Sequence, residues 1–249
     1  MYQIRQAKIK DFIQGKQIVT IRELRDLCPD VSLMTLHRDL DALANDGSLI
    51  KLRGGIKVIR QAGESSFQIR QNESMEAKKL IAKKAVGLLN EGGAVFFDAG
   101  TTTLAVIKAM PDINLTVITN GANFAGELQR FANITAYICC GVLNKSHMAL
   151  SGHGTLDFLS EINIDVGFIG VSGYSKDSGF TCGIESDMHV KKLVIGKARK
   201  SVVLMDAAKL SRLMPYTFAS LEDIDCVIGD DSMPDEFLRD AREAGVTVL

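Results

Sequence analysis

The six residues Asp98–Thr103, with the sequence DAGTTT, combine the groups that an anion-binding loop needs. They follow an apolar segment, Ala94–Phe97, and precede the helical stretch Leu104–Ala109. Glycine lets the backbone approach a ligand closely, and N–H groups at a helix N-terminus, with three hydroxyls, favour an anion such as phosphate. The loop matches neither a Walker loop nor the G-x-G-x-x-G dinucleotide fingerprint. A phosphate site and a simple helix cap are both compatible with this pattern.

The elements that position this loop form a regular alternation. Beyond Ser74, the patterns predict strands at Ala94–Phe97, Leu115–Ile118, Ile134–Ile138, Val166–Val171, Val202–Met205 and Cys226–Ile228. They predict helices at Met75–Asn90, Leu104–Ala109, Asn123–Phe131, Thr155–Ile162, Ser186–Arg199 and Asp235–Ala244, with the lysines of the first in solvent. Alternating strands and helices are typical of an α/β domain with a largely parallel sheet. We therefore predict a Rossmann-like α/β domain.

Small or polar residues follow each predicted strand. They are Thr119-Asn120-Gly121, Cys139-Cys140-Gly141, Ser172-Gly173 and Asp206-Ala207-Ala208-Lys209, in addition to the DAGTTT loop. In open α/β sheets, ligands bind outside the carboxyl ends of the strands. We expect one ligand pocket at this edge, with phosphate at the Thr101–Thr103 end and Lys209 adding a positive charge.

The first 60 residues contain a different pattern, in which a basic residue opposes an apolar stripe. In Ser32–Gly47, Arg38 points away from one narrow helical stripe at about 100° per residue, and that stripe consists of Leu33, Leu36, Leu40 and Leu43. Ser32 can cap the helix at its N-terminus and Gly47 can end it. Alone, the stretch also fits an ordinary surface helix, but its neighbours favour a DNA-recognition helix.

Those neighbours are two further helices and a hairpin. One helix is expected at Gln3–Gln14, and another begins at Thr20 with a capping box, Thr20-Ile21-Arg22-Glu23. Leu49–Ile59 alternates like a hairpin that turns at Gly54-Gly55, with Ile50 and Leu52 facing one way and the basic residues the other. This order predicts a winged helix-turn-helix. We expect its DNA-binding side chains to be Thr20, Ser32, Met34, Thr35, His37, Arg38, Lys51, Arg53 and Lys57.

Composition agrees with two unequal domains. The chain has 249 residues, 46% of them hydrophobic, and a net charge of −1. Residues 1–60 carry 11 basic and 7 acidic side chains, whereas the remainder carries 18 and 23, which suits a DNA-binding domain on an acidic partner domain. We predict a winged helix-turn-helix at 1–60, a linker at 61–74 and an effector-sensing and oligomerisation domain at 75–249.

The motifs resemble those of a known family. The run SLMTLHRDLDALANDGSLIKLRGG is similar to the DNA-binding signature of the DeoR family of bacterial transcriptional repressors. The phrases FFDAGTTT, LTVITN, GFIGVSGY and VVLMDAAK resemble that family's sensor domain, in the same order. This chain departs from the family at His37-Arg38, where two arginines are usual, and at Arg53, where His is common. Both changes bear on the preferred operator rather than on DNA binding itself.

The resemblance implies a sensor fold similar to ribose-5-phosphate isomerase and the CoA transferases, and an effector that is a phosphorylated sugar. By analogy, Gly100, Thr101, Thr102 and Thr103 hold the phosphate. Asp98, Asn120, Gly141, Glu185 and Lys209 are candidates for the sugar end. Ser172 stands where the family and the isomerase usually have Asp, which removes a carboxylate from the pocket edge.

Three functional classes fit the sequence. The first is a regulator, most simply a repressor of carbohydrate metabolism, that binds operator DNA and a phosphorylated sugar as a dimer or tetramer. The second is a sugar-phosphate isomerase with an added domain, although Ser172 occupies the position where a carboxylate base is expected. The third is a redox-responsive regulator acting through Cys139 and Cys140. Only the first uses both halves, so we predict a non-enzymatic regulator.

No metal or cofactor is expected, because the four histidines lack metal-ligand spacing. The five cysteines include no C-x-x-C pair, and no apolar run has the length of a membrane span. No signal peptide opens the sequence. The sequence therefore predicts a cytoplasmic protein without a membrane partner.

Overall fold

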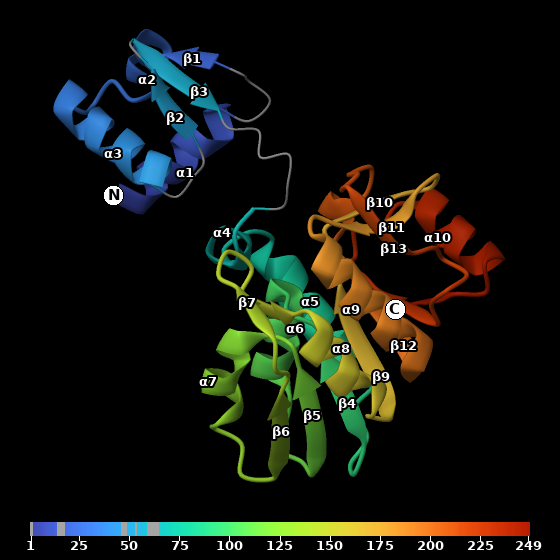
Figure 1. The fold of residues 1–249 in the computed structure, drawn as a ribbon. Helices are drawn as coiled ribbons and strands as arrows, with labels where there is room; N and C mark the ends of the chain where they lie inside the picture. Colours follow the sequence, from blue (N-terminus) through green and yellow to red (C-terminus); the bar gives the residue numbers. More distant parts are fainter. Residues whose placement is uncertain (1, 14–17, 46–48, 53, 59–64) are drawn as a thin grey trace. The chain divides into compact units, whose positions relative to one another are not determined.

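The computed structural model describes residues 2–13, 18–45, 49–52, 54–58 and 65–249 (Figure 1). It divides into two compact units, Met1–Gly63 and Glu64–Leu249, which we call the head and the body. Among the described residues, no helix has the length and apolar character required to cross a membrane.

The described residues of the head form three helices and a small antiparallel sheet. The helices are α1 (Tyr2–Ile13), α2 (Ile21–Leu27) and α3 (Leu33–Asn45), and the strand order is β1 (Ile18–Thr20), β3 (Gly55–Val58), β2 (Leu49–Leu52). Strand β1 was not predicted, because three residues are too few to show an alternating pattern. The apolar core is made by Ile9, Ile13, Val19, Leu24, Cys28, Leu36, Leu40, Leu43, Leu49 and Ile56.

The predicted N-terminal caps at Thr20 and Ser32 are confirmed, whereas Gly47, the predicted end of the Ser32 helix, lies outside the described residues. The hydroxyl of Thr20 accepts a hydrogen bond from the Glu23 backbone N–H at 3.2 Å, and the Glu23 carboxylate accepts one from the Thr20 N–H at 2.8 Å. The hydroxyl of Ser32 likewise accepts from the Thr35 N–H at 3.2 Å. These bonds satisfy N–H groups that a helix leaves unpaired in its first turn.

The predicted apolar stripe of α3 needs one correction. Leu36, Leu40 and Leu43 are buried, but Leu33, the first residue of the helix, is 43% exposed. Asp39 is fully buried beside this stripe and forms an ion pair with Arg5 of α1. A helical-wheel argument assigns charged residues to solvent, so it could not identify a buried carboxylate with a partner 34 positions away.

The hairpin is present, but its predicted alternation is reversed. Leu49 and Ile56 are buried, whereas Leu52 is 45% exposed. The register places Lys51 opposite Ile56 and Lys57 opposite Ile50, so Lys57 does not stand opposite Lys51. The prediction placed Ile50 and Leu52 on the apolar side of the hairpin, whereas the buried Leu49 lies on the other side. Successive residues of a strand face opposite sides, so an error of one residue exchanges the two faces.

The body is built on a seven-stranded parallel sheet, so the predicted fold class is confirmed. The strand order is β15 (Thr247–Val248), β14 (Cys226–Ile228), β12 (Ala198–Leu204), β9 (Ile164–Gly170), β4 (Ala94–Phe97), β5 (Leu115–Thr119), β6 (Ile134–Ile138). Every pairing in this sheet is parallel. The carboxyl ends of the strands therefore share one edge, which is where the DAGTTT loop lies.

Helices cover both faces of this sheet (Figure 1). On one face lie α5 (Met75–Val86), α6 (Thr101–Ala109), the 3₁₀ turn η1 (Ala122–Phe124) and α7 (Ala125–Leu128). On the other lie α8 (His153–Ser160), α9 (Glu185–Lys197) and α10 (Asp235–Glu243). Within β4, Val95 and Phe97 pack toward α5 and α6, while Phe96 packs toward α9. This explains why the strand reads as a continuous apolar run.

Several short elements of the body were not predicted. A second sheet contains β10 (Gly173–Ser175), β11 (Gly179–Cys182) and β13 (Tyr216–Ala219), all antiparallel. A separate hairpin pairs β7 (Val142–Asn144) with β8 (Ala149–Ser151), and η2 (Ala207–Lys209) is a 3₁₀ turn. Each strand has three or four residues, so its pattern is too short to separate from a loop.

The predicted linker also needs correction. Its residues 65–74 belong to the body and contain a short helix, α4 (Phe67–Gln71). Phe67 is 2% exposed and joins the apolar core that contains Val95 and Phe97. The polar composition of the segment concealed this single apolar anchor. Residues 59–64 lie outside the described part of the chain.

Candidate functional site: a cationic cavity at the strand ends

The loop after β4 is held by its own hydroxyl. The Gly100 N–H donates to the Thr103 hydroxyl oxygen at 3.0 Å, and that hydroxyl lies 2.5 Å from the Asp98 carbonyl and 2.8 Å from the Gly100 carbonyl. Thr103 is fully buried. Its hydroxyl therefore fixes the turn into α6 and is directed into the loop.

Asn120, after β5, supports the same loop from the neighbouring strand. Its side-chain oxygen accepts a hydrogen bond from the Ala99 N–H at 2.8 Å, and its amide donates to the Leu150 carbonyl at 3.2 Å. Only 1% of Asn120 is exposed. The residue connects the ends of β4 and β8, which makes it a structural support of the loop.

A buried ion pair lies beside the loop. The ammonium of Lys191, on α9, contacts the Asp98 carboxylate and donates to the Gly170 carbonyl at 2.8 Å. Asp98 also accepts a hydrogen bond from the Gly170 N–H at 3.1 Å. Burial alone would lower the pKa of Lys191, but the charge of Asp98 raises it above its ordinary value. Lys191 therefore stays charged at neutral pH, and its charge offsets that of the Asp98 carboxylate.

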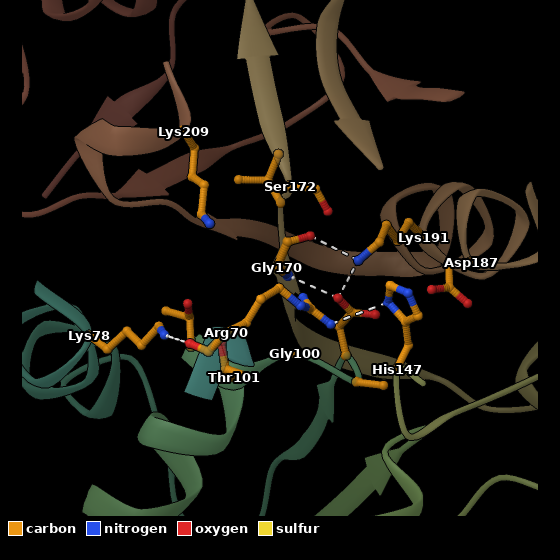
Figure 2. Close-up of a pocket in the computed structure, with 14 residues that line it drawn as sticks. Arg70, Lys78, Gly100, Thr101, His147, Gly170, Ser172, Asp187, Lys191 and Lys209 are labelled. Carbon is orange, nitrogen blue, oxygen red and sulfur yellow. Dashed lines mark hydrogen bonds and ion pairs between the residues drawn. The ribbon is translucent and has the colours of Figure 1, made fainter. Parts of the chain in front are cut away.

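A cavity opens over these groups at the carboxyl edge of the sheet (Figure 2). Four cationic side chains and two carboxylates line it, so positive charge is in excess. The lining residues are Arg70, Lys78, Asp98, Ala99, Gly100, Thr101, Thr102, His147, Gly170, Val171, Ser172, Asp187, Lys191 and Lys209. In Figure 2, Lys78 and Lys209 extend toward the space beside Thr101, while the guanidinium of Arg70 reaches across the cavity to His147.

The cations in this cavity are close enough to influence one another. Burial, and then the positive charge of Lys209, lower the pKa of Lys78 from its ordinary value to about 8. Arg70 contributes in the same direction, and the carboxylates of Asp206 and Glu73 oppose it. A cluster of like charges under partial burial is an arrangement that an added anion stabilises.

The structure brings some of the predicted sensor residues together and separates others. Asp98, Gly100, Thr101, Thr102 and Lys209 line the cavity. Thr103, Asn120, Gly141 and Glu185 do not. Gly141 has φ +131°, and a Cβ there would lie 2.4 Å from the Ser151 carbonyl oxygen, so glycine is required by the close approach of two chain segments.

Sequence reasoning missed several lining residues. Lys78 and Lys191 are 5% and 6% exposed, although helix patterns placed such lysines in solvent. Arg70 was assigned to the linker, and His147 was not singled out. No local pattern marks these four side chains, because their roles depend on contacts between distant segments. One signal was available: at about 100° per residue, the four lysines of Met75–Asn90 spread over about 240° of the helix, which is too wide for one solvated face.

In the head, α3 presents an exposed face. Met34 is 82% exposed, His37 and Arg38 are exposed, and Thr35 is half-buried. Lys51 donates to Asp41 of the same helix at 2.7 Å, which ties the hairpin to α3. Arg53 and the side chain of Lys57 lie outside the described part of the structure.

The two cysteines of the redox hypothesis differ in environment. Cys139 is 3% exposed, and burial raises the pKa of its thiol to about 12. A thiol that stays protonated at neutral pH reacts slowly with oxidants. Cys140 is exposed, and its thiol contacts the Gly154 carbonyl. The structure therefore gives no support to a reactive cysteine pair.

Both units match known families. The model described as "DeoR-like helix-turn-helix domain" matches residues 5–62, and the model described as "DeoR C terminal sensor domain" matches residues 73–231. The two-unit chain is thus a helix-turn-helix regulator with a sensor domain. It belongs to the DeoR family of transcriptional regulators, in agreement with the resemblance read from its motifs.

Individual relatives cover the full chain. The HTH-type transcriptional regulator GlpR of Haloferax volcanii is 32% identical over 98% of this chain and 96% of its own length. The HTH-type transcriptional repressor GlcR of Bacillus subtilis is 33% identical over 100% of this chain and 96% of its own length. Among solved structures, ribose 5-phosphate isomerase A of Methanocaldococcus jannaschii aligns at 18% identity over 55% of each chain, with a TM-score of 0.40.

Proposed function

We propose that the protein is a DNA-binding regulator of carbohydrate metabolism whose DNA affinity is controlled by a phosphorylated sugar bound in the cationic cavity. One observation carries the proposal: three cationic side chains, Lys78, Lys209 and Arg70, line the same cavity as Thr101 and Thr102 at the N-terminus of α6. Helix N-terminal N–H groups, hydroxyls and cations are the groups that bind phosphate in proteins.

The opposite side of the cavity suits the sugar. His147, Ser172 and Asp187 offer hydrogen-bonding side chains there, and Ser172 replaces the carboxylate usual in the family. Asp98, the carboxylate of the loop, is paired with Lys191. Isomerisation requires a carboxylate base that is available to the substrate, and this pairing occupies Asp98. The pairing and the names of both relatives favour ligand sensing over catalysis.

The head supplies the DNA-binding surface. Arg38 points outward from α3, on the side away from the buried leucines, and we infer that it reaches a guanine edge in the major groove. Thr35 and Lys51 would contact phosphates. A single winged helix covers a short site, so we also propose a dimer or tetramer held by the body, in which two heads occupy two half-sites. Sedimentation of the full chain at micromolar concentration tests this, and a monomer would contradict it.

A thermal-shift comparison tests the ligand proposal. The full chain is heated with each of a set of sugar phosphates, with the same sugars lacking phosphate, and with inorganic phosphate. A ligand at 100 times its Kd adds about 2.7 kcal/mol to the stability of the unit that binds it. We expect the body transition to rise with at least one sugar phosphate and to stay unchanged with its parent sugar. If every sugar phosphate and its parent sugar shift the transition equally, the cavity is not a phosphate site.

A further inference from the structure

The segment 65–74, the first described part of the body along the chain, contacts residues that line the cavity. Phe67 is buried, and its backbone N–H donates to the Ser146 carbonyl at 2.8 Å. His147, the next residue, lines the cavity. The described part of the body therefore begins, along the chain, with a segment that is anchored at the cavity.

Arg70, on α4, links this segment to the cavity directly. Its Nε donates to the Ser65 carbonyl at 2.9 Å, and a terminal nitrogen lies 3.3 Å from Nδ1 of His147. The same side chain lines the cavity in Figure 2. A guanidinium has five N–H donors in a planar fork, so it can hold a backbone carbonyl and a phosphate oxygen together.

Lys78, on α5, holds the other end of the segment. Its ammonium donates to the Glu73 carbonyl at 2.5 Å and also contacts the Arg70 carbonyl. Lys78 is 5% exposed and lines the same cavity. Two cationic residues of the cavity therefore also fix the backbone of residues 65–74, one from within the segment and one from α5.

Without an anion, these two cations and Lys209 share one cavity and repel one another; after burial, the larger cause, the charges of Lys209 and Arg70 both lower the pKa of Lys78. This repulsion opposes the docking of Arg70 beside Lys78. A phosphate between them would remove the repulsion and accept hydrogen bonds from both, since charge-assisted bonds to phosphate are among the strongest in proteins.

We propose that an anion bound between Arg70, Lys78 and Lys209 tightens residues 65–74 onto the body, and that this segment carries the effector signal toward the head. The proposal rests on the proposed function and adds its route of regulation. Such coupling is reciprocal. If the anion changes the affinity of the head for DNA by some factor, bound DNA changes the affinity of the cavity for the anion by the same factor.

Hydrogen exchange of the full chain measures the segment directly. The probe is inorganic phosphate at ten times its Kd, which slows exchange by up to about tenfold at amides that open only when the ligand has left. In the wild type we expect slower exchange in two places, the loop 98–102 and the segment 65–74. DNA affinity is measured under the same conditions, with a DNA duplex that the wild-type chain has selected from a random pool.

Two variants remove one cation each. Arg70→Met lies on the segment, and Lys209→Met lies in η2, on the other side of the cavity. Each is examined at ten times its own Kd for phosphate, so that both cavities are filled. We expect Lys209→Met to retain the slowed exchange in 65–74 and the change in DNA affinity. Arg70→Met should protect the loop 98–102 alone, with no change in DNA affinity. Arg70→Lys, which keeps the charge without the fork, should give an intermediate response.

The outcomes separate the two proposals. If phosphate leaves 98–102 of the wild type unchanged, the cavity is not an anion site and both proposals fail. If 98–102 is protected but 65–74 is not, or if Arg70→Met responds like Lys209→Met, only the coupling through α4 is refuted. Unfolding curves of the variants establish that the body is folded in each comparison.

Discussion

The head and the body place their functional side chains in opposite ways. In the head, the candidate DNA-contacting residues Met34, His37 and Arg38 lie on one exposed face of a single helix. In the body, the candidate ligand-contacting residues come from α4, α5, α6, α9 and η2, together with three loops. One surface is local in sequence and open to solvent, whereas the other is assembled from distant segments and largely buried.

This difference determines how each unit tolerates change. An exposed residue on a helix can be replaced without disturbing the fold, so operator preference can vary at positions such as His37 while the head stays intact. In the cavity, Lys78 and Lys191 also bond backbone carbonyls, so a replacement there alters both ligand binding and local structure. We expect substitutions in the head to separate stability from function more cleanly than substitutions in the body.

The largest effect should come from a negative charge placed in the cavity. Thr102→Glu puts a carboxylate at the N-terminus of α6, where phosphate would lie, and juxtaposed like charges cost several kcal/mol. We expect the affinity for a responsive sugar phosphate to fall by more than about 100-fold in calorimetry. Gln129→Glu, an exposed change of the same charge outside the cavity, is the matched control and should bind normally. Normal binding by Thr102→Glu would show that the loop is only a helix cap.

The next effect concerns a buried charge in the head. Asp39→Asn removes the carboxylate that pairs with Arg5, and we expect a loss of about 2–3 kcal/mol, since Arg5 remains partly exposed. Asp41→Asn, two residues away, breaks an exposed pair with Lys51 and should cost less than about 1 kcal/mol. Chemical denaturation of the two variants measures both values. Equal losses would contradict the difference in burial.

Arg38→Ala should weaken DNA binding by the head without lowering its free energy of unfolding. Losing a bidentate contact to guanine costs about 1–3 kcal/mol on a selected duplex and relaxes specificity there. Lys51→Ala should instead weaken binding to all duplexes alike. Competition assays with selected and random DNA distinguish these results. If Arg38→Ala weakens both kinds of duplex equally, Arg38 contacts the DNA backbone.

The smallest predicted effect is a pH dependence of the body. Lys78 has a pKa of about 8 in the free protein and must be protonated to attract an anion. As pH rises through 8, the competent fraction falls, so at pH 9 the affinity for phosphate should be about tenfold weaker. Lys78→Met should bind weakly at all pH values and lack this decline. A wild-type affinity that stays constant from pH 7 to 9 would exclude Lys78 from the site.

The sequence predicted most of what depends on local pattern. The order of the longer helices and strands in both units, the caps at Thr20 and Ser32, and the position of the DAGTTT loop follow from periodicity and turn chemistry. Leu33 was predicted wrongly, because a helical wheel cannot tell where the core ends along a helix. The orientation of the wing was also wrong, because a short hairpin does not specify which face is buried.

The cavity could be predicted only in part, for a different reason. The loop 98–103 carries its own signal, but Arg70, Lys78 and Lys191 become cavity residues through packing between segments up to 93 positions apart, as in the pair of Lys191 with Asp98. Burial of a lysine depends on such a partner and leaves no mark in the local pattern. The α4 segment was missed for the same reason, since one buried Phe67 anchors an otherwise polar stretch.

The most direct test of this account is a DNA titration of the full chain with a responsive sugar phosphate, on wild type and Thr102→Glu. Couplings between sites typically change affinity by about 5–150-fold. We predict a change of that size for the wild type on its selected duplex, and none for Thr102→Glu, whose DNA affinity without ligand should equal that of the wild type. If Thr102→Glu responds with an unchanged midpoint, the effector acts elsewhere and the central claim is wrong.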